Sequence, residues 1–560
     1  MNRIIWLLLF ATLLSCKQEV KKTEAEVVLW EPYNDSAQVA ANQDHEVERM
    51  RYKLIQSKVI DKNEVFRPLY AEVSAFSETS YQKLKPLVLE QDIPTIQAAV
   101  RSGKLTYEEL VLFYLYRIYK YELDNVTTLN TVIALNPNVV DEARQRDSEL
   151  KAGDTGDKHA IYGMPILLKD NINSSGMRTT AGSIALAYND PEDAFIVRQL
   201  KDKGALILGK VNLSEWAYFM CSGCPVGYSA IGGQTLNPYG PRQFESGGSS
   251  SGSGTSVAAN YAVAAVGTET SGSILSPSSQ NSVVGLKPTV GLLSRSGIVP
   301  ISGTLDTPGP MTKNVTDNGI FLDAMRGFDE TDEASVQTNW EGVWYKPAED
   351  DSGLKGKKLG VFKSLMESDS IYRTTVAKLR DLGARIFEFS PPEVDMSGFI
   401  NILNMDMKHD LPAYLERFTK NNSEVTINSI ADAVAFNESD SLLRIPYGHA
   451  LFEGILADST TAEELAEIKA RLQKNGRTYF NTAMNEFRLD AVLSINNYHA
   501  GYAAVAKYPA LTVPMGYKES GEPISLTFIG KQYEEGRLLK LGKAFEDAIQ
   551  ARNMPQGYED

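Results

Sequence analysis

The sequence predicts an α/β protein, and three consecutive segments carry this prediction. Residues 164–168 form a short apolar run that is typical of a buried strand. Residues 193–203 have the apolar spacing of an amphipathic helix that ends at Gly204, and residues 205–208 form a second apolar run. This alternation of strand and helix indicates a sheet with helices layered on it.

The remaining segments extend this pattern in both directions. Residues 46–57 have helical spacing, and residues 93–119 predict two helices joined by a turn. Residues 212–216 are expected to open another helix, and residues 396–487 to be largely helical. Further strands are expected at residues 360–362, 384–389, 491–495, 511–514 and 524–529.

The N-terminus resembles a bacterial export signal. Arg3 precedes an apolar core, residues 4–14, that is too short for a typical membrane-spanning helix. The core ends in Leu-Leu-Ser-Cys, which resembles a lipobox, so we expect cleavage after Ser15 and a lipid on Cys16. An ordinary signal peptide with an incidental cysteine is the alternative. The expected product is an exported lipoprotein, anchored to a bacterial membrane and facing the periplasm.

Charge narrows the classes of partner. The 560-residue chain has a formal net charge of -15. Such a balance argues against nonspecific nucleic-acid binding and gives no basic face for a membrane surface. The expected partners are therefore a small-molecule or peptide substrate and the lipid anchor, and the oligomeric state is left open.

A Gly/Ser-rich stretch, residues 247–273, is the centre of the functional analysis. Such a run is often a flexible linker. Here it opens directly into small apolar residues, 257–266, and is followed by a second glycine-rich turn, 267–273. Two glycine-rich turns around a packed element allow a backbone to approach a ligand closely, because glycine has no side chain. We therefore interpret it as a binding element.

Three motifs in order resemble the amidase signature family of serine hydrolases. They are Gly-Met-Pro-Ile-Leu-Leu-Lys-Asp at 163–170, Gly-Gly-Ser-Ser at 247–250 and Gly-Thr-Glu-Thr-Ser-Gly-Ser at 267–273. Residues 285–300 and 306–311 look like the peptide amidase branch of this family. The resemblance implies a central mixed β-sheet covered by helices on both sides.

The resemblance also implies a domain plan. Residues 1–15 would be the signal peptide, and residues 16–86 a lipid-tether linker with an added N-terminal helical arm. The amidase domain would span 87–545, with the helical insertion at about 396–487. Residues 546–560 would form a C-terminal tail.

The family uses a Ser-Ser-Lys triad and no cofactor or metal. Matching the motifs assigns Ser273 as the nucleophile, Ser249 as the bridging serine after a cis peptide, and Lys169 as the base. Burial would lower the pKa of Lys169, whereas a nearby Asp170 would raise it. The expected oxyanion donors are the backbone N–H groups of Thr270, Ser271, Gly272 and Ser273.

One departure from the family concerns the width of the acyl pocket. Ser271 stands where the family often has glycine, and Glu269 replaces the common aspartate.

Arg295 and Asp306 are expected to pair and hold a turn. Trp216, Tyr218 and Ser222 follow in a region that lies near the substrate in the family, although aromatic residues there are as often core.

Cys221 and Cys224 are the two cysteines besides Cys16. A metal site needs more ligands, and a redox motif needs its own fold context. In an oxidising compartment we expect a local disulfide, with two packed free thiols as the alternative.

Rival functions remain. Gly-Ser-Ser-Ser-Gly at 248–252 also fits the nucleophile elbow of α/β-hydrolases, with Ser250 as nucleophile. Its base would be a histidine, with His409, His449 and His499 as candidates. A non-catalytic binding protein on an amidase scaffold, and a fatty-acid or aryl amide hydrolase, are further alternatives. A glutamyl-tRNA amidotransferase subunit is disfavoured by the export signal.

Overall fold

The computed structural model describes residues 27–153, 158–337, 353–419 and 423–560. The expected signal peptide and Cys16 lie outside these residues. No helix in the described part is both long and apolar enough to cross a membrane.

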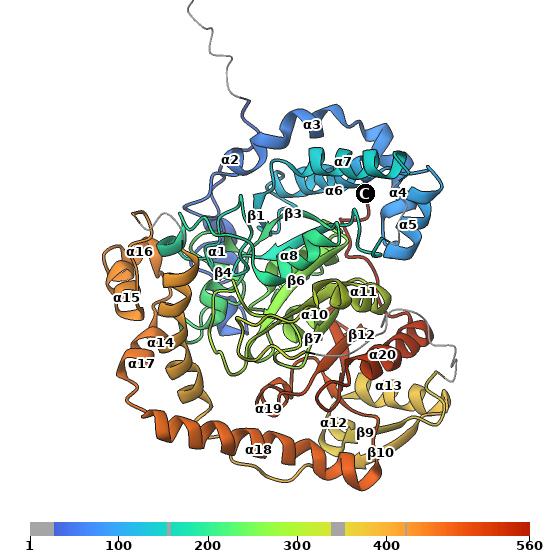
Figure 1. The fold of residues 1–560 in the computed structure, drawn as a ribbon, viewed down its shortest axis with the longest axis vertical. Helices are drawn as coiled ribbons and strands as arrows, with labels where there is room; N and C mark the ends of the chain where they lie inside the picture. Colours follow the sequence, from blue (N-terminus) through green and yellow to red (C-terminus); the bar gives the residue numbers. More distant parts are fainter. Residues whose placement is uncertain (1–26, 154–157, 338–352, 420–422) are drawn as a thin grey trace, which may run out of the picture.

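A single mixed sheet of 11 strands organises the molecule and confirms the α/β class, with helices around it (Figure 1). The spatial order is β1-β3-β2-β6-β8-β7-β12-β13-β11-β9-β10. The central strand pairs β2–β3 and β2–β6 are parallel, whereas β6–β8 and β12–β13 are antiparallel. The strands are β1 Val132–Leu135, β2 Pro165–Lys169, β3 Leu206–Val211, β6 Ala264–Glu269, β7 Val284–Lys287, β8 Thr307–Thr312, β9 Lys358–Phe362, β10 Arg385–Phe389, β11 Ala491–Ile495, β12 Ala510–Tyr517 and β13 Pro523–Ile529. A separate two-stranded sheet contains β4 Tyr228–Ser229 and β5 Gly233–Gln234.

The helices fall into three groups along the chain. Each predicted strand and the helix at residues 193–203 are found within a few residues of the expected bounds. The first group is α1 Ser36–Ala41, α2 Lys62–Phe66, α3 Tyr70–Ala75, α4 Glu78–Val88, α5 Ile93–Arg101, α6 Tyr107–Glu122 and α7 Val139–Lys151; the second is α8 Phe195–Asp202, α9 Ser251–Ala258, α10 Leu275–Gln280, α11 Val315–Met325, α12 Lys363–Ser368 and α13 Ser370–Asp381; the third is α14 Phe399–Phe418, α15 Ile430–Glu438, α16 Ser441–Arg444, α17 Ala450–Ala457, α18 Ala462–Phe487, α19 Ala500–Ala506 and α20 Glu535–Ile549.

Helices α14 to α18 are the predicted helical insertion. They run down one side and along the lower edge of the molecule in Figure 1. Their apolar side chains form a second core with Trp216 and Val299, separate from the core that the sheet builds. The insertion therefore packs against the chain near the end of the central strands and forms a wall there.

The segment before α5 is part of the main body. Met50, Tyr52 and Ile55 are buried in the main core, and the carbonyl of Ile55 accepts the N–H of Gln234. The expected helix at residues 46–57 is reduced to a 3₁₀ turn, Glu48–Met50, because the Asp35 carboxylate holds the following chain through the N–H of Ile55. The predicted helical arm is thus a set of short helices integrated into the domain.

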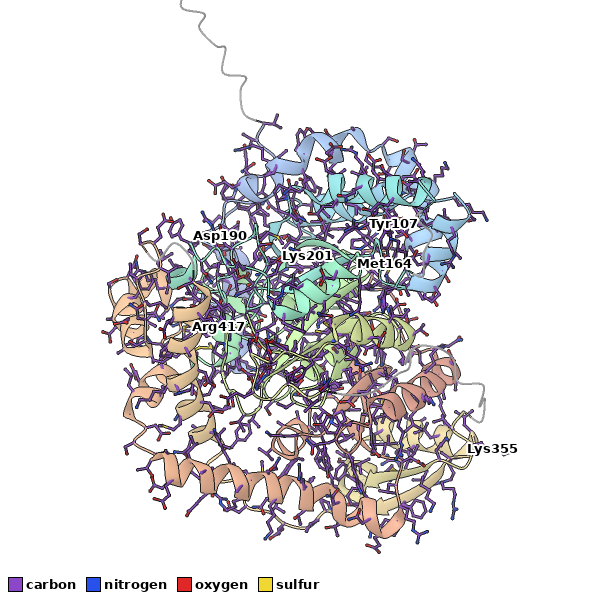
Figure 2. The ribbon with its side chains drawn as sticks, in the orientation of Figure 1. Tyr107, Met164, Asp190, Lys201, Lys355 and Arg417 are labelled. Carbon is purple, nitrogen blue, oxygen red and sulfur yellow. A yellow bond between two sulfur atoms is a disulfide. The ribbon has the colours of Figure 1, made fainter. Side chains whose placement is uncertain are left out.

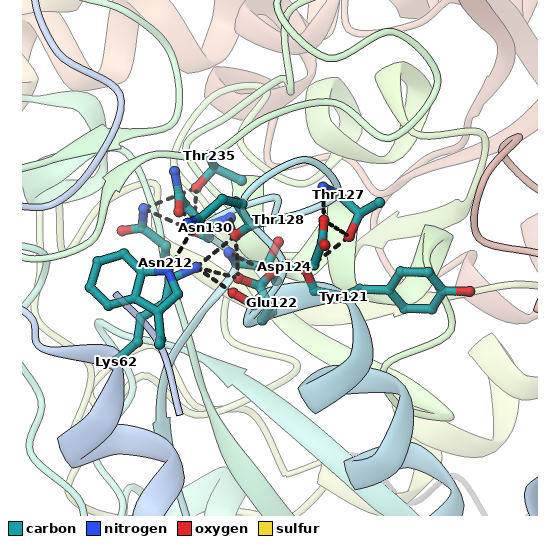
Figure 3. A network of polar contacts seen from close by, with 12 residues as sticks. Lys62, Tyr121, Glu122, Asp124, Thr127, Thr128, Asn130, Asn212 and Thr235 are labelled. Atoms are coloured by element: carbon teal, nitrogen blue, oxygen red, sulfur yellow. Dashed lines mark hydrogen bonds and ion pairs between the residues drawn. The ribbon is translucent and has the colours of Figure 1, made fainter. Parts of the chain in front are cut away.

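A buried polar network ties this segment to α6. The Lys62 ammonium donates to the carbonyl of Glu122 and to the hydroxyl of Thr128, and the Glu122 carboxylate also accepts the N–H of Thr131 (Figure 3). The buried charges are therefore hydrogen-bonded, as burial of a charge requires.

The C-terminal residues also lie on the main body. Arg117, fully buried on α6, donates to the carbonyls of Ala259, Asn260, Tyr558 and Asp560. The predicted tail therefore begins inside α20 and ends in contacts with Arg117 of α6, which also holds the segment that follows α9.

The helix expected at residues 212–216 is the clearest error of sequence reasoning in this region. A 3₁₀ turn, η4 Glu215–Tyr218, stands there instead. Trp216, Ala217 and Tyr218 have φ angles of 50°, 54° and 73°, which lie in the left-handed region that interrupts a right-handed helix.

Candidate active site

The site lies where two parallel strands end beside the Gly/Ser stretch. Strand β2 ends at Lys169 and its parallel neighbour β6 ends at Glu269, so their carboxyl ends meet at one edge of the sheet. Ser249 precedes α9 and follows a cis Gly248–Ser249 peptide, as the family resemblance implies.

Lys169 and Ser249 are in direct contact. Lys169 Nζ donates to Ser249 Oγ at 2.7 Å, to Thr268 Oγ1 at 2.8 Å and to the Thr268 carbonyl at 3.1 Å. Both Lys169 and Ser249 are fully buried. Thr268 Oγ1 also accepts from the side-chain amide of Asn171 at 3.0 Å, which fixes its position. Sequence reasoning missed Thr268, although it lies inside the third motif.

Because Lys169 is buried, its ammonium group loses its proton near neutral pH. Loss of hydration disfavours the ammonium form and lowers the pKa of Lys169 to about 7, while the charges of Asp306 and Glu269 oppose this shift. Asp170 was expected to oppose it, but its carboxylate pairs with Lys210 at 2.9 Å. Successive residues of a strand point to opposite faces, so Asp170 turns away from Lys169.

Glu269 organises the turn that carries Ser273. Its carboxylate accepts the N–H groups of Gly272 at 2.6 Å, Ile274 at 2.7 Å and Leu275 at 3.0 Å. The Ser273 carbonyl accepts the N–H of Ser250 at 3.2 Å, which brings the two glycine-rich segments together. Among the described residues, no hydrogen bond joins the hydroxyls of Ser249 and Ser273.

Three of the four expected oxyanion donors are uncommitted. Within the described part of the chain, the N–H groups of Thr270, Ser271 and Ser273 have no acceptor. The N–H of Gly272 instead donates to Glu269, because that carboxylate closes the turn from behind. Gly272 has a φ of 91°, a conformation that favours glycine.

Asp306 holds the same turn from the other side. Its carboxylate accepts the Thr270 hydroxyl at 2.5 Å and the N–H groups of Ile301 and Ser302. Burial raises the pKa of Asp306 to about 6. The expected Arg295–Asp306 pair is wrong: the Arg295 guanidinium pairs with Asp332 at 2.5 Å.

A cavity of about 690 Å³ opens beside this turn. Its lining includes Thr268, Thr270 and Asn171 and apolar residues such as Ile301 and Met405. Arg417, near the end of α14, also lines it, and Figure 2 labels this residue on the helical insertion. The site is therefore enclosed between the sheet edge and the insertion.

The three residues expected to contact substrate lie outside this cavity, where Ala217 lines the wall instead. Trp216 is buried against Phe452, with ring centroids 5.6 Å apart. The Tyr218 hydroxyl donates to the carbonyl of Cys224 at 2.7 Å, and Ser222 is exposed. The left-handed turn explains this placement, because it directs Ala217 to the cavity and Trp216 into the core.

Cys221 and Cys224 are joined by a disulfide, with their Cα atoms 5.9 Å apart. The bridge closes a short loop directly after η4, so it lies close in sequence to the cavity wall at Ala217.

The alternative nucleophile Ser250 is poorly placed for an elbow mechanism. Its hydroxyl is buried, donates to the Thr268 carbonyl at 3.0 Å and accepts the Thr268 N–H at 3.1 Å. The candidate histidines contact other groups: His409 contacts Asp410, His449 contacts Glu453 and His499 contacts Ser494.

Comparison with known proteins decides the family. A family model described as Amidase matches residues 109–495. The chain belongs to the amidase family. A probable amidase of Arabidopsis thaliana is 36% identical over 483 residues, which cover 84% of this chain and 92% of that protein.

Solved amidase structures support the same assignment. An amidase family protein from Bacillus anthracis has a TM-score of 0.84 at 37% identity, covering 90% of this chain and 100% of that one. The native peptide amidase from Stenotrophomonas maltophilia has a TM-score of 0.77 at 36% identity, covering 84% of this chain and 99% of that one. The protein is thus an amide-hydrolysing enzyme with the amidase signature fold, related to the bacterial peptide amidase branch.

Proposed function

We propose that this amidase hydrolyses carboxylic amides with a Ser-Ser-Lys triad of Ser273, Ser249 and Lys169. The observation that carries the proposal is the buried 2.7 Å contact between Lys169 Nζ and Ser249 Oγ, next to the turn that bears Ser273. A neutral Lys169 uses its two N–H bonds on Thr268, so that its lone pair faces Ser249 and accepts the hydroxyl proton.

The acylation step follows from these positions. Ser273 Oγ attacks the amide carbon while its proton passes to Ser249, whose own proton passes to Lys169. The N–H groups of Thr270, Ser271 and Ser273 stabilise the oxyanion. The two serine hydroxyls come into hydrogen-bond contact when substrate is bound, as catalytic contacts often tighten only in the complex.

The second half of the reaction runs the relay backwards. Lys169 returns its proton through Ser249 to the leaving nitrogen, so the C–N bond breaks and an amine or ammonia departs. A water molecule then attacks the acyl ester of Ser273 and gives up a proton along the same path. The carboxylic acid is released and all three residues regain their starting protonation states.

A peptide C-terminal amide is the substrate we favour. The likeness to a solved peptide amidase over 84% of this chain supports it. The cavity is also wide enough for a substrate side chain beside the turn. Fatty-acid and aryl amides are the alternative substrates, and a panel of the three amide classes distinguishes them.

We further propose that the enzyme is an exported lipoprotein anchored through Cys16. The Leu-Leu-Ser-Cys end of the apolar core supports this. Cys16→Ala should release the protein from membranes and abolish labelling by a fatty-acid probe; unchanged labelling would reject the proposal.

The triad is tested by a fluorophosphonate label. Mass spectrometry should place the adduct on Ser273, and Ser273→Ala should lose both the label and amidase activity. An adduct on Ser250 would overturn the proposal and favour the elbow mechanism.

A further inference from the structure

The loop that follows β11 lies directly against the turn that carries Ser273, the proposed nucleophile. A Cβ placed on Gly272 would be 3.0 Å from the Asn497 side-chain nitrogen and 3.6 Å from the Ala500 Cβ. A Cβ on Gly501 would likewise lie 3.7 Å from the Ser271 hydroxyl. Asn497 and Ser271 therefore flank Gly272, one residue before Ser273.

Both of these polar side chains are uncommitted. In the part of the chain that the structure describes, neither the Asn497 carboxamide nor the Ser271 hydroxyl has a hydrogen-bond partner within the protein. Asn497 is exposed and Ser271 is half-buried, so both can meet a molecule bound at the turn. Their position beside the uncommitted N–H groups makes the whole turn a cluster of free hydrogen-bonding groups.

The loop is nevertheless held firmly. Asn496 accepts the N–H of Ser525 at 2.8 Å through its side chain and donates its own N–H to the Ser525 carbonyl at 3.0 Å. Its carbonyl accepts the Thr527 hydroxyl, and the Asn497 carbonyl accepts the N–H of Ala500 at 3.0 Å. A fixed backbone that carries a free carboxamide is pre-organised for binding, because little conformational freedom is left to lose.

We propose that Asn497 and Ser271 form a subsite for a second peptide group in the substrate. A carboxamide donates and accepts at once, and a hydroxyl does the same, which matches the C=O and N–H of a peptide unit. This inference rests on the proposed hydrolysis of C-terminal amides. In that reaction ammonia is the only leaving group, so the second peptide group belongs to the acyl part. The enzyme therefore selects acylamino amides over simple alkyl or aryl amides.

Two substrates that differ in one group isolate the subsite. N-acetylphenylalaninamide and 3-phenylpropanamide share the benzyl group and the scissile amide, and only the first carries a peptide group. Wild-type enzyme should prefer the first by tenfold or more in kcat/KM. Asn497→Ala should reduce this preference by about three- to tenfold, as expected for one lost hydrogen bond, and leave 3-phenylpropanamide hydrolysis within about twofold of wild type. Ser271→Ala should reduce the preference by a similar factor.

The control is Asn428→Ala, an exposed asparagine of the helical insertion outside the cavity wall. It should keep the wild-type preference, and Asn497→Ser serves as a second variant should Asn497→Ala fold poorly. Equal loss on both substrates, or a wild-type enzyme with no preference, would overturn the subsite while leaving the amidase proposal intact. Hydrolysis of neither substrate, with no label on Ser273, would overturn both.

Discussion

Lys169 Nζ and Ser249 Oγ lie 2.7 Å apart, and both residues are fully buried from solvent. The two residues come from segments 80 positions apart in the chain, the end of β2 and the turn before α9. Their contact couples the protonation of a buried amine to a hydroxyl beside the proposed nucleophile.

This relationship predicts the pH dependence of the enzyme. The proposed relay needs neutral Lys169, whose pKa is lowered to about 7, so kcat/KM should rise with pH through about 7 and then level off. Lys169→Ala should lose about 10²- to 10⁴-fold in kcat/KM. Lys169→Arg should be nearly as poor, because a guanidinium keeps its proton.

The measurement is kcat/KM against pH for the three proteins, with circular dichroism to confirm folding. If Lys169→Arg keeps most of its activity, the lysine acts through charge or packing alone.

A second prediction concerns Glu269. Glu269→Ala removes the acceptor of three backbone N–H groups, and each unsatisfied buried group costs about 1–3 kcal/mol. We expect a lower melting temperature and a fall in kcat of at least tenfold, with a smaller change in KM. Glu269→Asp, which restores the residue common in the family, should retain more activity than Glu269→Ala. The exposed Glu416→Ala is the matched control, and equal kcat values in the alanine variant and wild type would contradict the role.

The disulfide gives a third prediction. Because Cys221 and Cys224 are bridged, an alkylating reagent should modify neither residue in unreduced, denatured protein and both after reduction. Mass spectrometry of the peptide that contains the two residues reads this directly. Alkylation of both without reduction would mean that the purified protein carries free thiols.

Arg117 gives a prediction for stability. Arg117→Met removes a buried guanidinium that serves four backbone carbonyls, two of them near the C-terminus. We expect the free energy of unfolding to fall by about 3 kcal/mol, since hydrogen bonds to charged groups are the stronger ones. Urea unfolding measures this, with the exposed Arg101→Met as control. A loss no larger than that of the control would show that the C-terminal contacts add nothing.

Sequence alone predicts those features of this enzyme that depend on residues close together in the chain. The strand at residues 491–495 and the position of Lys169 at the end of the apolar run of β2 are of this kind. The ion pair of Asp170 with Lys210, and that of Arg295 with Asp332, depend on partners about 40 residues away in the chain, so neighbouring charges in the sequence suggested the wrong pairs. The helix predicted at residues 212–216 is wrong for a different reason. The backbone there has left-handed angles, which the tertiary structure imposes against the helical propensity of the segment.

The last prediction concerns Asp306 and separates the effect of its charge on the proposed triad from its effect on the shape of the turn. Its carboxylate is the first of the two charges that raise the pKa of Lys169 against the effect of burial. In Asp306→Asn that charge is gone, so the ammonium form of Lys169 is less stable and its pKa falls further. The rise of kcat/KM with pH should therefore move to lower pH than in wild type.

The same change also perturbs the turn, and the two effects are distinguishable. An asparagine oxygen in the place of Asp306 Oδ2 can still accept the N–H groups of Ile301 and Ser302, but the amide nitrogen in the place of Oδ1 cannot accept the Thr270 hydroxyl, so some loss of stability and kcat is expected. Such a loss lowers the whole pH profile without moving it, whereas the charge effect moves the profile along the pH axis. Asp410→Asn, which changes another carboxylate of the cavity wall that accepts the N–H of Gly303, is the control and should leave the profile in place. A profile that stays in place in Asp306→Asn would show that burial alone sets the pKa of Lys169.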